Sequence, residues 1–203
     1  MGQYYHPSVL KKNWKTAKNP VECSLYSHKF NNGLKLMEHS YAGNGFVGAM
    51  CHLLATTYKG YPFVWVGDYA DNQITKCYPK GKQDENGNEG AYIYGFASDV
   101  CETKRIGDLT TSLIASGATG KQYAYAINFT KKEFVKIPKF NKKEWRIHPL
   151  PLLCADGNGR GGGDYGFDDE RVGSWAYDRI GVTNSKKETE GMIEVDWYFQ
   201  PDF

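Results

Sequence analysis

The chain has 203 residues, of which 40% are hydrophobic and 24% are charged, and its formal net charge is +2. These values are typical of one soluble globular domain, spanning 1–203, with a sizeable core. A charge so near neutrality does not by itself predict nucleic-acid binding, and a nucleic-acid partner is not expected. No apolar window approaches the length of a membrane span.

Cysteine usage indicates the compartment. The five cysteines are widely spaced, include no CxxC pair and have no zinc-finger spacing relative to histidine. The N-terminus also lacks the apolar core of a secretory signal. We therefore expect reduced thiols in a cytoplasmic protein, and no motif predicts a cofactor.

Most of the chain has the pattern of short strands separated by polar turns. The segments expected as strands are 3–11, 21–27, 63–70, 91–98, 146–153, 172–182 and 192–199. Residues 122–137 form the clearest hairpin. Pro7 and the prolines of 146–153 confine their strands to a sheet edge or a bulge.

One segment has a clear helical period. Asn44 can cap a helix over about 44–58, in which apolar residues recur at helical spacing. Residues 34–40 fit a strand or the entry to a helix, and 104–120 fit either state. Residues 71–90 are polar and are expected to form a mobile loop. The prediction is a single α+β domain, mainly antiparallel sheet with one principal helix.

Charge is unevenly distributed along the chain. Between Lys121 and Ile147, eight Lys or Arg residues face only Glu133 and Glu144. Such a block can attract phosphate, and it is also what a solvated surface looks like. Both interpretations stay open.

A glycine-rich loop follows the apolar run HPLPLLCAD. Because so many glycines are costly to order, the backbone there must approach something closely or adopt positive φ. Successive N–H groups of such a loop can form an anion nest, and Arg160 adds a planar fork for phosphate or carboxylate. The predicted binding loop comprises Gly157, Asn158, Gly159, Arg160, Gly161, Gly162, Gly163, Asp164 and Tyr165. The alternative is a structural crossover in which Arg160 pairs with Asp156 or Asp164.

Familiar motifs fit this loop poorly. Gly157, Gly159 and Gly162 match G-x-G-x-x-G, but no helical period follows to present its N-terminus to a pyrophosphate. A calcium loop starting at Asp156 would have Arg160 and Phe167 at ligand positions. An oxygen-ligand metal site remains as a secondary candidate, using Asp156, Asn158, Asp164 and Asp168.

Catalytic candidates are few. His39 and Asp68 each end an apolar segment beside Gly and Tyr, and a His–Asp pair can perform acid–base work. The alternative is that both cap local backbone. The aromatic residues that could stack a ring beside the loop are Tyr41, Trp65, Tyr69, Tyr165 and Trp175. Asn44, in the same HSYAGN phrase as His39, joins them as a binding candidate.

The phrases MGQYY, LMEHSYAGN, WVGDYAD, HPLPLL and GNGRGGGDY cover much of the chain. On these phrases the chain resembles a family of small proteins from bacteriophages and gut bacteria. The resemblance implies a phage or prophage-like source and the cytoplasm of a bacterial host. It implies no activity, so no catalytic residue is transferred from it.

Three functional hypotheses follow. The first is a non-enzymatic binding protein for a nucleotide-like or other phosphate-bearing small molecule, which could sequester a host signalling nucleotide and so evade host defence. The second is an enzyme, a phosphodiesterase or transferase, that uses His39 and Asp68 on such a ligand. The third is a structural or virion-associated interaction protein, for which a homo-oligomer is expected.

Overall fold

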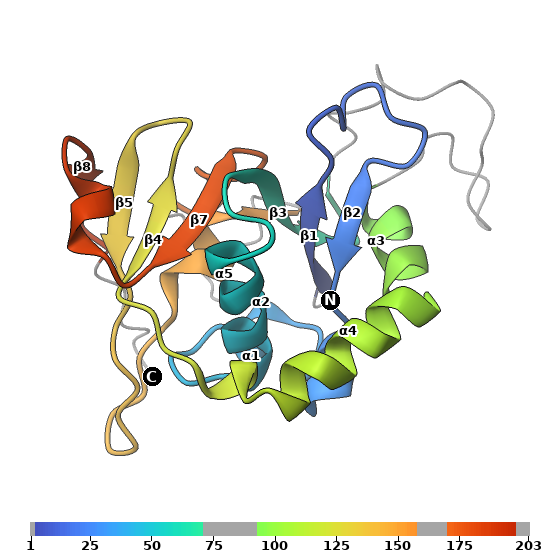
Figure 1. The fold of residues 1–203 in the computed structure, drawn as a ribbon, viewed down its shortest axis with the longest axis horizontal. Coiled ribbons are helices and arrows are strands. Elements are labelled where there is room, and N and C mark those ends of the chain that lie inside the picture. The colour runs from blue at the N-terminus through green and yellow to red at the C-terminus, as the bar shows by residue number, and fades with distance from the viewer. Residues whose placement is uncertain (1–2, 71–92, 158–169, 198–203) are drawn as a thin grey trace.

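The computed structural model describes residues 3–70, 93–157 and 170–197. They form an α+β fold in which strands dominate over helices, as predicted (Figure 1). The strands are β1 (Tyr5–Leu10), β2 (Val21–Ser24), β3 (Tyr61–Gly67), β4 (Tyr125–Asn128), β5 (Glu133–Lys136), β6 (Ala155–Asp156), β7 (Arg179–Thr183) and β8 (Ile193–Glu194).

The strands form one sheet in the order β2-β1-β3-β7-β4-β5-β8, with β6 beside β3. All pairs are antiparallel except β3–β6 and β5–β8. The long strand β3 joins the two halves, because Tyr61 and Pro62 pair with β7 while Phe63–Gly67 pairs with β1. The sheet thus links segments from both ends of the chain.

Helices pack around this sheet. They are α1 (Leu36–His39), α2 (Gly45–Ala55), α3 (Ile93–Cys101), α4 (Lys104–Ala115) and α5 (Pro149–Leu153), with 3₁₀ turns η1 (Ser27–Phe30), η3 (Ala118–Gly120) and η5 (Lys186–Thr189). Helix α3 packs against β1 and β2, while α2 packs against β7 and η3. Every residue of β1 is buried, which requires that both faces of this strand are covered.

The predicted helix at 44–58 is confirmed as α2. Asn44 Oδ1 accepts hydrogen bonds from the backbone N–H groups of Phe46 and Val47 at 2.9 and 3.1 Å. These bonds satisfy two of the donors that a helix start leaves without partners. Beyond the helix, Gly60 has φ +76°, a conformation in which glycine is favoured.

The strand predicted over 91–98 is wrong, because Ile93–Cys101 is helix α3. Its aromatic residues favour a strand by propensity. Ile93, Ala97 and Val100 are nevertheless spaced by four and three residues and are buried together, which is the stripe of a helix that packs on a sheet. Tertiary packing has outweighed the local preference.

The strand predicted over 146–153 is also wrong. His148 caps the short helix α5, accepting a hydrogen bond at Nδ1 from the Leu150 N–H, and Pro149 occupies its first position. Proline is favourable there because the first N–H groups of a helix have no intrahelical partner. The two prolines begin a helix rather than interrupt a strand.

The strands predicted over 172–182 and 192–199 are much shorter in the described residues, where they are β7 and β8. The hairpin over 122–137 is confirmed as β4 and β5, while 104–120 contains α4 and 34–40 contains α1. The structure adds α3 and α4, of lengths comparable to α2, to the one principal helix predicted. Strand β1 lies between β2 and β3 rather than at an edge, although its pairing with β2 begins only after Pro7. The predicted mobile loop at 71–90 lies outside the described residues.

Candidate ligand pocket

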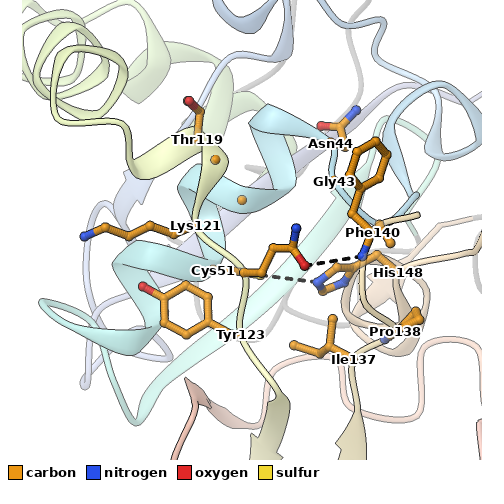
Figure 2. Close-up of a pocket in the computed structure, with 14 residues that line it drawn as sticks. Gly43, Asn44, Cys51, Thr119, Lys121, Tyr123, Ile137, Pro138, Phe140 and His148 are labelled. Atoms are coloured by element: carbon orange, nitrogen blue, oxygen red, sulfur yellow. Dashed lines mark hydrogen bonds between the residues drawn. The ribbon is translucent and has the colours of Figure 1, made fainter. Parts of the chain in front are cut away.

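A cavity of about 220 Å³ lies beside the N-terminal half of α2 (Figure 2). Its walls come from 42–51, from 119–123 after α4 and from 137–140 after β5, and His148 lies at its floor. We call it the α2–η3 pocket. Segments separated by nearly a hundred residues therefore build one cavity.

Two glycines allow these walls to approach α2. A Cβ added at Gly48 would lie 2.5 Å from the carbonyl oxygen of Thr119, and one added at Gly43 would lie 2.3 Å from the ring of Phe140. Gly43 also has φ +84°, which L-residues with side chains rarely adopt. Side chains at either position would push the pocket walls apart.

The pocket floor contains a thiol–imidazole pair that the sequence did not predict. Cys51 Sγ lies 3.6 Å from His148 Nε2, and both residues are buried. Burial raises the pKa of the Cys51 thiol to about 12 and lowers the pKa of His148 to about 3. The pair is neutral at physiological pH.

The proton arrangement also opposes catalysis by this pair. His148 Nδ1 accepts a hydrogen bond from the Leu150 N–H at 3.3 Å, so the proton of the neutral ring is on Nε2 and faces the Cys51 sulfur. A base that activates a thiol must instead offer a free lone pair to it. The geometry supports a structural floor rather than a nucleophile with its base.

Gln122 supplies the pocket's open hydrogen-bonding capacity. Its Oε1 accepts a hydrogen bond from the Phe140 N–H at 3.3 Å, whereas its amide nitrogen donates to no other residue in the described ranges. Ile137, Pro138 and the Phe140 ring add apolar surface. The cavity therefore combines an apolar lining with an available pair of N–H donors.

One lysine lines the pocket, and a second lies next to lining residues in the sequence. Lys121 belongs to the lining, with its ammonium directed away from His148 (Figure 2), and Lys139 lies between Pro138 and Phe140. Neither forms an ion pair with any residue that the structure describes. Tyr123 also lines the pocket, and its hydroxyl lies 2.8 Å from Nδ1 of His52.

Among the predicted site residues, only Asn44 lines this pocket. Its oxygen caps α2, and its Nδ2 donates to Asn32 Oδ1 at 2.6 Å. The side chain is thus engaged in holding the pocket wall.

His39 and Trp65 lie together in the core. His39 is fully buried, its Nδ1 donates to the Gly33 carbonyl at 3.2 Å, and its Nε2 accepts from Trp65 Nε1 at 3.0 Å. Burial lowers the pKa of His39 to about 4. Because both ring nitrogens have internal partners, this histidine does not offer Asp68 or a ligand a hydrogen bond.

The other described candidates are dispersed. Asp68 Oδ1 accepts a hydrogen bond from the Tyr4 N–H at 3.0 Å, and burial raises the pKa of its carboxyl group. Tyr69 is exposed and Tyr41 lies 6.4 Å from Trp145 between ring centroids. Trp175 is buried and donates from Nε1 to Glu133 Oε2 at 2.7 Å. They do not gather around one cavity.

The glycine loop is described only at its start. A Cβ at Gly157 would lie 2.2 Å from Gln3 Oε1 and 2.5 Å from the Tyr5 hydroxyl, so a larger residue there would have to displace these side chains. Asp156 accepts a hydrogen bond from the Tyr177 hydroxyl. The other predicted loop residues, together with the metal candidates Asn158, Asp164 and Asp168, lie outside the described residues. Within the described ranges, no group of three potential ligands could hold a metal ion.

A second thiol–imidazole pair lies beneath α3. Cys101 Sγ is 3.8 Å from His6 Nδ1 and 3.4 Å from Ser24 Oγ. Burial raises the pKa of Cys101 to about 11 and lowers that of His6 to about 4. This thiol too stays protonated at physiological pH.

Comparison with models of protein families, with curated proteins and with solved structures found no match. No helix in the described ranges has the length and apolar character needed to cross a membrane.

Proposed function

We propose that the protein binds a nucleotide-like or other phosphate-bearing small molecule, and that the α2–η3 pocket receives the planar part of this ligand. The observation that carries the proposal is a mainly apolar cavity with an available amide donor, Gln122, and with Lys121 in its lining, which forms no ion pair with a described residue. Ligand sites typically have this composition, mostly apolar with a few placed polar groups.

The size of the cavity supports this division of the ligand. About 220 Å³ is below the roughly 300–1,000 Å³ of pockets that enclose a whole drug-sized ligand. A ring can enter, while charged phosphates stay at the mouth, where Lys121 and Lys139 are available as cations. Phosphate groups at such a position need not lose their hydration.

Binding without turnover is the better supported alternative. The two thiols that lie next to histidines, Cys51 and Cys101, have raised pKa values, and His39 is saturated by internal hydrogen bonds. The enzyme hypothesis based on His39 and Asp68 therefore has less support than simple binding. In the phage setting that the resemblance implies, a protein of this kind would sequester a host signalling nucleotide in the cytoplasm.

The test is calorimetry and thermal shift with nucleoside mono-, di- and triphosphates, cyclic dinucleotides and inorganic phosphate. The key variant is Gln122→Glu, which keeps the acceptor for Phe140 N–H but replaces the amide donors with negative charge. We expect affinity to fall about tenfold or more, as for a lost hydrogen bond plus repulsion. Asn13→Asp, an exposed site between β1 and β2, makes the same charge change elsewhere and should leave affinity unchanged.

Three outcomes would overturn the proposal. The first is equal weakening by Gln122→Glu and Asn13→Asp, which would move the site away from the pocket. The second is consumption of the nucleotide, detected by phosphorus NMR, which would establish an enzyme. The third is a stable large homo-oligomer with no ligand response, which would favour a structural protein.

A further inference from the structure

Residues 138–146, which we call the basic arm, leave the body of the protein as a narrow projection (Figure 1). Asn141 and Glu144 form an antiparallel bridge near its tip. At its base, the Ala42 N–H donates to the Arg146 carbonyl at 2.8 Å, and Tyr41 bridges Ile147. The base is therefore joined by backbone hydrogen bonding to the segment that begins α2.

The arm carries a concentrated positive charge. Lys139, Lys142 and Lys143 are exposed and form no ion pair with any described residue. Its one acid, Glu144, accepts two hydrogen bonds from Arg146 at 2.8 and 2.7 Å, so these two charges compensate each other. Among the described residues, the three lysines of this projection therefore have no acidic partner.

Two large aromatic side chains accompany these cations. Phe140 and Trp145 flank the Asn141–Glu144 bridge, one on each side of the turn, and each is 44% exposed. Phe140 packs against Gly43 and also lines the α2–η3 pocket. Exposed aromatics on a basic element are costly to leave in water and suit stacking with bases.

We propose that the basic arm binds the sugar–phosphate backbone of single-stranded nucleic acid while Trp145 and Phe140 stack its bases. This deepens and rests on the proposed function, since Phe140 belongs both to the arm and to the pocket that would hold one nucleotide. The low net charge of the whole chain opposes nucleic-acid binding, but binding depends on where the charge is concentrated.

Single strands fit these features better than duplexes do. Stacking on an aromatic side chain requires an open base face, and duplex DNA or RNA buries those faces in its own helix. Lysines read phosphate as point charges without demanding one geometry, which suits a flexible strand. An acidic peptide would satisfy the lysines but would make no use of the exposed ring faces, which bases can stack on.

The test uses labelled oligothymidylates of increasing length, from the mononucleotide to about eight nucleotides, in fluorescence anisotropy. We expect affinity to rise with length until the arm is covered. With three phosphate contacts, the slope of log K against log salt should be about −2, at about −0.7 for each contact on a single strand. The double variant Lys142→Ala/Lys143→Ala should reduce this slope by about 1.4.

Matched variants separate charge from stacking. Lys186→Ala/Lys187→Ala removes another exposed lysine pair, in η5, and should leave the slope unchanged. Trp145→Ala should weaken the longer oligonucleotides about tenfold, whereas Trp145→Phe, which keeps a ring, should retain most of the affinity. Tyr4→Ala removes an aromatic side chain of similar exposure elsewhere, 46%, and should change nothing.

The failures of the two proposals differ. Mononucleotide binding with no increase in affinity for longer strands would overturn the arm proposal and leave the pocket intact. If affinity rises with length and is unchanged by Gln122→Glu, the arm proposal is supported and the pocket proposal is overturned. The arm proposal would also be overturned if a duplex bound as tightly as a single strand or more tightly. Loss of binding in the Lys186→Ala/Lys187→Ala variant would overturn it as well.

Discussion

The His39–Trp65 pair and the α2–η3 pocket both combine polar and aromatic groups, yet they differ in how much of their bonding capacity is used. In the core pair, each ring nitrogen of His39 has an internal partner, and both side chains are fully buried. In the pocket, the amide nitrogen of Gln122 donates to no described residue. Residue types typical of active sites thus stabilise the fold where all their hydrogen-bonding groups have internal partners. They can bind a ligand where a donor or acceptor has no such partner.

Acid should destabilise the protein through three buried histidines, two of them in the core and the third at the floor of the pocket. His6, His39 and His148 are buried with pKa values lowered to about 4, 4 and 3, so the unfolded state binds protons below about pH 6.5 that the folded state does not. Stability is therefore complete above pH 6.5 and falls as the pH decreases toward 4. At pH 5 the loss is about 2 kcal/mol for each histidine, or about 6 kcal/mol together.

Urea unfolding at pH 7, 6 and 5 measures this effect. The midpoint should fall at each step, with the cooperativity parameter unchanged. A midpoint that stays constant from pH 7 to pH 5 would show that these histidines do not remain neutral in the folded protein.

Removing the imidazole tests the core pair directly. His39→Ala leaves a cavity and deprives Trp65 Nε1–H of its acceptor, so we expect a loss of about 3 kcal/mol, or about 10 °C in melting temperature. Gln122→Glu, in the exposed part of the pocket, should change the free energy of unfolding by less than about 0.5 kcal/mol. Similar losses for both variants would remove the distinction between the two regions.

Asn44 shares features of the core pair and of the pocket, because it caps α2 and also lines the pocket. Asn44→Ala should destabilise the protein by about 1 kcal/mol through the lost cap, measured by chemical denaturation. Asn44→Asp retains the capping oxygen and should recover most of this stability. No recovery with Asp would indicate that the bond to Asn32 matters more than the cap.

A small effect on stability is also expected for Arg160→Ala in the glycine loop. As a ligand-binding group, Arg160 should contribute to affinity for phosphate-bearing molecules, while the melting temperature stays within a few degrees. Differential scanning fluorimetry with and without ligand measures both quantities. A collapse of stability would instead support the structural crossover in which Arg160 pairs with Asp156 or Asp164.

Sequence reasoning predicted the elements whose signals are local. Asn44 before an apolar helical period identified α2, and two alternating runs around a short turn identified the β4–β5 hairpin. Caps and turns depend on residues within a few positions of each other, so one chain suffices to recognise them. The α+β class followed from the sum of these elements.

The sequence was misleading where packing outweighs propensity. Residues 93–101 have the composition of a strand but form α3, because a helix buries Ile93, Ala97 and Val100 against β1 and β2. The HPLPLL segment similarly became α5, since His148 supplies the cap that makes its prolines favourable. A closer look at His148 before Pro149 could have indicated this helix start.

Local sequence alone therefore determined the capped helix, the hairpin and the basic block, and it supplied the histidines and tryptophans. Only the tertiary structure decided their roles. It saturated His39 with Gly33 and Trp65, and it joined Cys51 to His148 across 97 positions of sequence. The physical reason is that burial and hydrogen-bond partners are set by which distant segments meet, and these determine whether a polar group is free to bind.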